Sequence, residues 1–547
     1  MISRSGSGVA ALCMAFVLAA PGADAGATRA IRSDPIVVES GSLAGTELAS
    51  GVRAYLGVPF AAPPVRELRW RPPQPLPHWE GTYHAARTAP ECIQTLRAHD
   101  INHYFGEEAT SEDCLYLNVW APPHRVGAPP VPVVVWIYGG GFTIGSASMA
   151  NYNGERLASK GVVYVALAYR VGALGFLAHP ELSAESPQRV SGNYGFLDQI
   201  AALQWIQRNI ARFGGDPGNV TIMGQSAGSA SVSVLQASPL GRGLFHRAVG
   251  MSGGALGASI GRARPLGVAE QWGRELQTIL KAQSLTALRR LPADRILAVQ
   301  GTTGRYGPLV DGWLLPEDPN AIFAAGKQND VPILIGYTRD EGFDAFNQVM
   351  TVAEYRAQAD RYGEHAASLL RLYPASSDAE ARRGALDIAR DATLGLQMRT
   401  WARAQTSTGK SSAFLYLFSR VHPYTPAVKF SDHDPTTIGA YHTGDVPYWL
   451  QTLDSLNLFR KTRDWTPYDR ELAARMSDVI VSFARTGKPL LSGIDWPVYR
   501  SADERVVEFG DSVRVIALPN SSKIDFLAAH PPREPVMGEG ARPRNRD

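Results

Sequence analysis

Hydrophobic and polar positions follow two alternating patterns along most of the chain. Six short runs are almost entirely apolar and rich in β-branched residues, which is typical of strands buried on both faces of a parallel sheet. These runs are 131–138, 162–169, 219–223, 247–251, 331–336 and 413–418. Segments of helical periodicity separate them, as in 198–210, where Leu203, Ile206 and Ile210 recur at helical spacing. The pattern predicts an α/β fold with a mostly parallel central sheet and helices on both faces.

Two longer helical stretches, 262–300 and 352–406, are too long for single crossovers. We expect them to be helical insertions that form a cap over the functional edge of the sheet. The proline-rich segment 59–77 predicts an extended N-terminal cover. Because no repeat or long linker interrupts the chain, residues 29–530 are predicted to form a single domain.

The two ends of the chain have a different character. Arg4, the apolar run 9–20 and the Ala23-Asp24-Ala25 pattern predict a signal peptide over residues 1–25, and hence export to the periplasm or secretion. An uncleaved anchor is the alternative, but a membrane span needs about 20 apolar residues, so no stable membrane insertion is expected. Residues 531–547 contain few apolar side chains, which predicts a disordered tail.

Composition and charge narrow the class of protein. The 547 residues are 45% hydrophobic and 19% charged, as in soluble globular proteins with a large core. Lys and Arg number 54 against 51 Asp and Glu, and the basic residues do not cluster in blocks, which argues against a nucleic-acid partner. Beyond the signal peptide only Cys92 and Cys114 remain. Two cysteines in an exported protein suggest one disulfide, with two free thiols as the alternative.

The pattern G-x-S-x-G occurs three times, around Ser226, Ser252 and Ser259. In a chain with 53 glycines the bare pattern is weak, so its context decides. A nucleophile elbow follows a buried strand and opens a helix, which lifts the serine hydroxyl above the sheet. Ser226 follows the run 219–223 and precedes a helix of small residues. Ser259 follows no strand, and Ser252 precedes no clear helix. Ser226 is therefore the predicted nucleophile, and Ser252 is expected to pack behind the site.

Three consecutive glycines, 139–141, follow the apolar run 131–137. Glycine lets bare backbone N–H groups approach a substrate oxygen, as an oxyanion hole requires; a plain flexible turn is the alternative. No G-K-[ST] or G-x-G-x-x-G follows, so a phosphate site is not expected. The chain has no H-E-x-x-H or C-x-x-C either, and neither a metal site nor a cofactor is predicted.

Two long motifs carry a family resemblance. Residues 213–228, which contain Ser226, and residues 112–122 resemble the two signatures of type-B carboxylesterases. This family belongs to the α/β-hydrolase superfamily and includes bacterial para-nitrobenzyl esterases, cholinesterases and some lipases. The resemblance extends over about residues 36–500. It implies the α/β-hydrolase fold and the hydrolysis of carboxylic esters.

The resemblance also implies roles for particular residues. The oxyanion donors of the family fall on the N–H groups of Gly140, Gly141 and Ala227. Its acid falls on Glu341, within the sequence Asp340-Glu341-Gly342. From the residues alone, Asp340 could serve as well. A buried carboxylate at this place holds the histidine tautomer and stabilises the imidazolium.

The base is expected on a loop late in the chain. The segment 439–446 matches the family's histidine loop and makes His442 the candidate among 12 histidines, with His433 and His422 as alternatives. The order Ser226, Glu341, His442 is the order of α/β-hydrolases.

Cys92 and Cys114 occupy the family positions of a disulfide that closes a loop at the rim of the active-site gorge, and Arg69 and Glu112 those of an ion pair that braces the loop. The sequence departs from that of cholinesterases at two places that bear on the substrate. No tryptophan lies between the two cysteines, and Gln225 stands where cholinesterases have glutamate. Cationic choline esters are therefore not expected.

Together these features predict a serine carboxylic-ester hydrolase that uses a Ser-His-Glu triad and an acyl-enzyme intermediate. The expected partner is a small-molecule ester, and the sequence does not indicate an oligomeric state. A lipase acting at lipid interfaces and a non-catalytic binding protein of the same fold are the alternatives.

Overall fold

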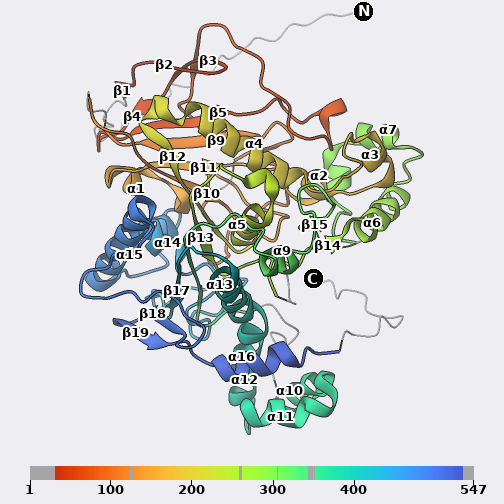
Figure 1. The fold of residues 1–547 in the computed structure, drawn as a ribbon, viewed down its shortest axis with the longest axis vertical. Coiled ribbons are helices and arrows are strands. Elements are labelled where there is room, and N and C mark those ends of the chain that lie inside the picture. The colour runs from red at the N-terminus through yellow and green to blue at the C-terminus, as the bar shows by residue number, and fades with distance from the viewer. Residues whose placement is uncertain are drawn as a thin grey trace, which may run out of the picture.

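A large, mostly parallel sheet runs through the molecule, with helices on both sides (Figure 1). The computed structural model describes residues 31–106, 108–123, 127–257, 261–302, 304, 306–342, 349 and 351–533. The predicted signal peptide 1–25, Ser259 and most of the predicted tail 531–547 lie outside the described residues. No helix in these described ranges is long and apolar enough to cross a membrane.

Twelve strands of the described chain form the main sheet. In spatial order they are β1 (Ile31–Arg32), β4 (Thr46–Glu47), β5 (Arg53–Pro59), β9 (Tyr116–Ala121), β11 (Val163–Leu167), β10 (Val131–Ile137), β12 (Gly215–Gln225), β13 (Arg247–Met251), β16 (Ile333–Thr338), β17 (Ala413–Phe418), β18 (Arg505–Phe509) and β19 (Val513–Ala517). The strands from β11 to β18 pair in parallel. The strands at both edges pair antiparallel.

Smaller strands lie outside this sheet, and the helices connect and cover it (Figure 1). These strands are β2 (Ile36–Val38), β3 (Gly41–Ala44), β6 (Thr82–His84), β7 (Glu91–Cys92), β8 (Thr110–Ser111), β14 (Arg264–Pro265) and β15 (Leu309–Val310). The helices are α1 (Glu155–Ser159), α2 (Gly172–Phe176), α3 (Pro180–Glu185), α4 (Tyr194–Asn209), α5 (Ala227–Ala237), α6 (Leu266–Ile279), α7 (Leu285–Arg290), α8 (Ala293–Leu297), α9 (Pro319–Ala324), α10 (Val352–Ala359), α11 (Ala366–Leu372), α12 (Asp378–Arg390), α13 (Leu396–Thr408), α14 (Val446–Trp449), α15 (Pro467–Thr486) and α16 (Ser521–Ala529).

The six apolar runs of the sequence are six neighbouring strands in the middle of the sheet: β11, β10, β12, β13, β16 and β17. The predicted α/β fold with a mostly parallel sheet is thereby confirmed. The sequence pattern did not single out the edge strands. β19, for example, is partly exposed along its whole length and therefore lacks a continuous apolar run.

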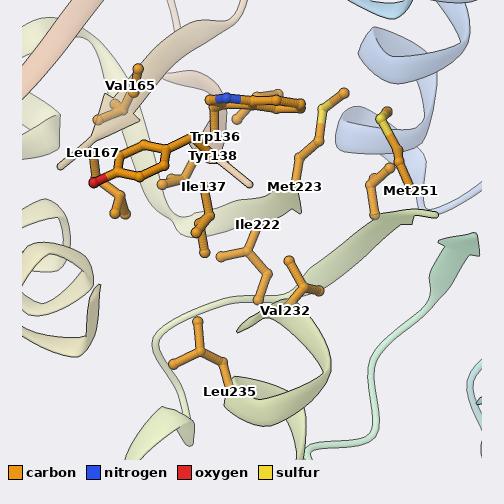
Figure 2. Close-up of a cluster of buried hydrophobic side chains, with 14 of the residues drawn as sticks. Trp136, Ile137, Tyr138, Val165, Leu167, Ile222, Met223, Val232, Leu235 and Met251 are labelled. Carbon is orange, nitrogen blue, oxygen red and sulfur yellow. The ribbon is translucent and has the colours of Figure 1, made fainter. Parts of the chain in front are cut away.

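The core beneath the site is formed by side chains of adjacent central strands and of α5. Figure 2 shows Trp136, Ile137, Ile222 and Met223 from two of these strands, with Val232 from the helix packed beneath them. All five are fully buried. Replacing such a side chain by alanine typically costs about 2–5 kcal/mol. This packing fixes the positions at which β10 and β12 end.

The two long insertions are helical, as expected. The first contains α6, α7 and α8, and the second contains α10 to α13. In Figure 1 α10 and α11 lie at the lower end of the molecule. With α12 and α16 they form a second hydrophobic cluster, which includes Tyr355 and Leu369. Only the start of α13 and the turn before it reach the cavity described below, through Leu394 and Gln397.

Cys92 and Cys114 are joined by a disulfide, and the Arg69 guanidinium forms a bidentate ion pair with Glu112. The loop that the disulfide closes holds Gln94. The Gln94 amide donates to the carbonyl of Gly145 at 2.8 Å and accepts from its N–H at 2.7 Å. The disulfide loop is thus tied to the segment that follows the three glycines 139–141.

Replacing Cys92 and Cys114 together by serine should lower the free energy of unfolding by about 3 kcal/mol, because a cross-link of this span restricts the unfolded chain. Guanidinium titrations of the variant and the wild type measure the difference. Wild type treated with reductant is the control and should match the variant. Equal stability of variant and untreated wild type would mean that the disulfide does not stabilise the fold.

Candidate active site

Ser226 lies at a strained turn between β12 and α5. Its backbone angles are φ 57° and ψ −124°, a region that costs a non-glycine residue about 1–3 kcal/mol and that is often found at functional sites. Two hydrogen bonds hold the turn: the Ser226 N–H donates to the carbonyl of Met251 at 2.8 Å, and its carbonyl accepts from Ala230 at 2.9 Å. Strand, sharp turn and helix follow one another as in a nucleophile elbow.

The two glycines of this motif are required by close packing. A Cβ on Gly228 would lie 2.0 Å from the carbonyl oxygen of Ile137, and one on Gly224 would lie 2.4 Å from the carbonyl oxygen of Gly228. The first turn of α5 can therefore sit directly against the end of β10. This contact brings the glycine loop that follows β10 beside Ser226.

The loop at Gly140 and Gly141 turns back on itself. Gly140 has φ 111°, and a Cβ on it would collide with the carbonyl of Ile144. Within the described chain no hydrogen bond is donated by the N–H of Gly140, Gly141 or Ala227. Gly141 and Ala227 line the same cavity as Ser226. Backbone donors in this position can bind an oxygen that becomes negative.

His442 and Glu341 are brought together from distant parts of the chain. The Glu341 carboxylate is fully buried, and its Oε2 lies 2.5 Å from His442 Nδ1. Its Oε1 accepts from the N–H of Thr338 at 2.9 Å. With Nδ1 bonded to the carboxylate, the other ring nitrogen of His442 faces the elbow, where Nε2 lies 3.0 Å from the side-chain nitrogen of Gln225. Gln225 directly precedes Ser226.

Asp340, the alternative acid, has different partners. Its carboxylate accepts from the N–H of Ala440 at 2.8 Å and from the Arg383 guanidinium at 2.6 Å. Burial raises the pKa of Asp340, but hydrogen bonds from Arg339 and Ala440 outweigh burial and lower the pKa below its usual value. Asp340 therefore anchors the loop that carries His442, and the geometry favours Glu341 as the partner of the ring.

His422 and His433, the alternative bases, also lie away from Glu341. His422 Nε2 donates to the carbonyl of Gly444 at 2.7 Å, and the Tyr441 hydroxyl lies 3.3 Å from His422 Nδ1. Burial, reinforced by the nearby Arg463 guanidinium, lowers the pKa of His422 to about 3. The ring is therefore neutral and holds residues on both sides of His442. His433 Nδ1 lies 2.8 Å from Asp432 Oδ2.

A cavity of about 590 Å³ adjoins Ser226, within the usual range of small-molecule sites. Its wall is formed by the glycine loop, the elbow, the disulfide loop and both helical insertions. The lining side chains other than glycine are Thr95, Phe142, Thr143, Ile144, Ser226, Ala227, Ala230, Ser252, Arg264, Leu297, Gln300, Tyr306, Pro308, Leu394 and Gln397. Ser252 is fully buried, and its hydroxyl has no hydrogen-bond partner among the described residues.

Comparison with known proteins identifies the family. The carboxylesterase family model matches residues 33–527. The chain belongs to the carboxylesterase family. It is 38% identical to the fumonisin B1 esterase of Sphingopyxis macrogoltabida over 528 residues, which is 92% of each chain. It is 31% identical to the para-nitrobenzyl esterase of Bacillus subtilis (strain 168), over 89% of this chain and 97% of that one.

Solved structures agree with this assignment. A structure of PNB esterase matches with a TM-score of 0.76 at 30% identity, covering 90% of this chain and 98% of the other. The predicted α/β-hydrolase fold is confirmed by this match. The protein is a carboxylic-ester hydrolase, and small-molecule esters are its substrate class.

Sequence reasoning missed the residues that brace this carboxylesterase site. Gln94 ties the disulfide loop to Gly145, Asp340 anchors the histidine loop, and His422 bonds to both sides of that loop. Asp340 and His422 were considered only as alternative catalytic groups. Their partners lie 22 or 100 residues away in the chain, so no local motif in the sequence marks the bracing role.

Replacing His422 by phenylalanine should lower kcat by about 10–100-fold and change KM by less than about threefold, because the loop of His442 loses two hydrogen bonds. His422→Gln keeps a donor for Gly444 and should recover part of kcat. His433→Gln is the matched control and should leave kcat unchanged. An unaltered kcat in His422→Phe would contradict the positioning role.

His422 should also affect how the free energy of unfolding changes at acid pH. A histidine with a folded pKa of about 3 and an unfolded pKa of about 6.5 takes up protons mainly on unfolding, so its contribution to stability is lost as the pH falls below about 6.5. The stability difference between wild type and His422→Gln should therefore shrink by about 2 kcal/mol between about pH 7.5 and pH 5. Urea titrations at both pH values measure it, and a constant difference would be the contrary result.

Proposed function

We propose that Ser226, His442 and Glu341 form a catalytic triad that hydrolyses carboxylic esters through an acyl-enzyme. The observation that carries the proposal is the 2.5 Å contact of His442 Nδ1 with the buried Glu341 carboxylate, beside the strained serine turn. A buried carboxylate on Nδ1 keeps the proton on that nitrogen and leaves the lone pair of Nε2 free to accept one. The nucleophile, the base and the acid are then Ser226, His442 and Glu341.

In the first half-reaction Ser226 Oγ attacks the ester carbonyl carbon while His442 Nε2 takes the hydroxyl proton. The carbonyl oxygen becomes an oxyanion and is bound by the N–H groups of Gly140, Gly141 and Ala227. The tetrahedral intermediate collapses when His442 passes its proton to the leaving alkoxide, so the alcohol departs. The acyl group remains bonded to Ser226.

In the second half-reaction water attacks the acyl-enzyme carbonyl and gives a proton to His442. The same backbone donors bind the second oxyanion, and the proton returns to Ser226 as the carboxylic acid leaves. Glu341 stabilises the imidazolium in both halves. In the resting enzyme Gln225 bonds to His442 Nε2. This hydrogen bond breaks when Nε2 takes the proton of the serine or of the water.

The cavity and the relatives bear on the substrate. About 590 Å³ accommodates an ester with a sizeable acyl or alcohol group. The relatives at 38% and 31% identity are named for fumonisin B1 and for a para-nitrobenzyl ester. We propose a site for bulky esters. The predicted signal peptide and the disulfide support export as part of the same proposal.

Ser226→Ala should lower kcat by about 10⁴–10⁶-fold with the fold intact. A fluorophosphonate probe should label the wild type at Ser226, as read by peptide mass, and should not label the variant. Ser252→Ala is the matched control, since Ser252 also lies in a G-x-S-x-G motif at a cavity wall, and it should still be labelled at Ser226. Esterase turnover by purified Ser226→Ala would refute the nucleophile.

Substitutions of the neighbouring acids Glu341 and Asp340 should differ in their effects on kcat and Tm. Glu341→Gln should lower kcat by about 10³–10⁴-fold, because the amide favours the wrong histidine tautomer. Asp340→Asn should lower Tm but leave kcat within about tenfold of the wild type. Steady-state kinetics and thermal melts of both variants test this. The assignment of the acid fails if Asp340→Asn costs as much kcat as Glu341→Gln without a loss of Tm.

A further inference from the structure

The loop that carries two of the proposed oxyanion donors is held differently at its two ends. Its first residue, Gly139, follows β10 and the buried Tyr138. The Tyr138 hydroxyl donates to the carbonyl of Tyr169 at 2.6 Å, and the Tyr169 hydroxyl donates to that of Tyr138 at 2.8 Å. The core therefore fixes the start of the loop. The end of the loop, at Gly145, lies in no helix or strand.

A side chain from the disulfide loop fixes this second end. The Gln94 amide accepts from the N–H of Gly145 at 2.7 Å and donates to the carbonyl of the same residue at 2.8 Å. Its second N–H donates to the carbonyl of Cys92 at 3.0 Å. Gln94 is only 3% exposed. The amide therefore pairs with Gly145 as a neighbouring antiparallel strand would, away from solvent.

The hydrogen bond from Gly145 also fixes the peptide group that precedes it. The carbonyl of Ile144 and the N–H of Gly145 belong to one planar peptide, so the acceptor on Gln94 sets the direction of that carbonyl. The Ile144 carbonyl in turn lies against Gly140, where a Cβ would collide with it. Gly145 itself lies against the start of the loop, since a Cβ on it would collide with the carbonyl of Gly139. A shift of Gly145 would therefore move Gly140.

The same turn sets the direction of one proposed donor. The N–H groups of Thr143 and Ile144 donate to the carbonyl of Gly140 at 3.0 and 3.1 Å. This carbonyl and the N–H of Gly141 point in opposite directions, because they share a trans peptide. With the carbonyl bound inside the turn, the Gly141 N–H points out of the turn, and Gly141 lines the cavity beside Ser226.

We propose that Gln94 positions the oxyanion hole, so that losing its amide weakens binding of the transition state but not of the ester. The inference rests on the proposed function, in which Gly140 and Gly141 act as donors. Gln94 is a positioning residue: it is not among the described residues that line the cavity, and it acts on the loop through Gly145. The disulfide loop, whose Thr95 lines the cavity, thereby also contributes to the chemistry.

The expected effect follows from the moment at which charge appears on the substrate. An ester carbonyl oxygen becomes negative only as Ser226 attacks, so donors to that oxygen stabilise the transition state more than the bound ester. Removing one donor from such a site typically lowers kcat by about 10²–10³-fold. Donors that are displaced but still present should cost less. In a variant without the Gln94 amide, kcat should therefore fall while KM changes little.

Gln94→Met keeps the length of the side chain and removes the amide. Its kcat for para-nitrophenyl acetate should be about 10–100-fold below that of the wild type, with KM within about threefold. Gln94→Ala leaves room for water beside Gly145, should change kcat in the same direction, and replaces Gln94→Met if that variant does not fold. Glu108→Gln is the matched control in the same loop and should leave kcat unchanged, because the Glu108 side chain is exposed and bonds to the Thr88 hydroxyl at 2.6 Å.

Two readouts separate positioning from a general loss of structure. A trifluoromethyl ketone adds Ser226 Oγ to its carbonyl and forms a tetrahedral oxyanion, so its Ki should rise in Gln94→Met by about the factor by which kcat/KM falls. A thionoester places sulfur, a larger atom and a weaker acceptor, in the oxyanion hole. The ratio of kcat/KM for ester over thionoester should fall at least about threefold in the variant, because a displaced hole favours oxygen less.

The outcomes separate this inference from the proposed function. An unaltered kcat in Gln94→Met and Gln94→Ala would overturn the role of Gln94. A fall in kcat with the ketone Ki and the ester-to-thionoester ratio of the wild type would also overturn it, because Gln94 would then act on the fold alone. The proposed function fails separately, if purified Ser226→Ala hydrolyses the esters or the ketone does not inhibit the wild type.

Discussion

The site depends on one steric constraint, the contact between the first turn of α5 and the end of β10. The backbones at Gly228 and Ile137 lie so close together that a side chain at position 228 would collide with the carbonyl oxygen of Ile137. This contact places Ser226 in a strained conformation and the glycine loop beside it. The strain of about 1–3 kcal/mol is tolerated because the buried side chains of β10, β12 and α5 hold both backbones (Figure 2). The core thus positions the proposed nucleophile and the start of the loop that carries two of the proposed oxyanion donors.

The histidine side of the site is built differently, from polar contacts between distant segments. His442 lies in a stretch of chain that forms no helix or strand. Asp340 and His422 fix this stretch through hydrogen bonds to Ala440 and Gly444. Because both hydrogen bonds are buried, they stabilise the structure more than bonds at the surface would. Leaving one of their donors or acceptors unpaired would cost free energy. A rigid apolar frame therefore carries Ser226, and a buried polar network carries His442, its proposed base.

This difference explains what the sequence could predict. The central strands are buried on both faces, so they read as continuous apolar runs, and two of them, β13 and β17, begin and end where their runs do. The serine motif combines with such a run and is local. The edge strand β19 is half-exposed and gave no clear run. His442 and Glu341 were reached through family resemblance. The bracing roles of Gln94, Asp340 and His422 were missed, because a buried polar partner 22 to 100 residues away leaves no local pattern.

Two acidic side chains lie near His442, the proposed base. Glu341 contacts His442 directly. Asp445, three residues after it, is fully buried and bonded to the Tyr416 hydroxyl at 2.7 Å; burial raises its pKa to about 6, so at neutral pH it adds a second negative charge on this side. Both favour an imidazolium during catalysis.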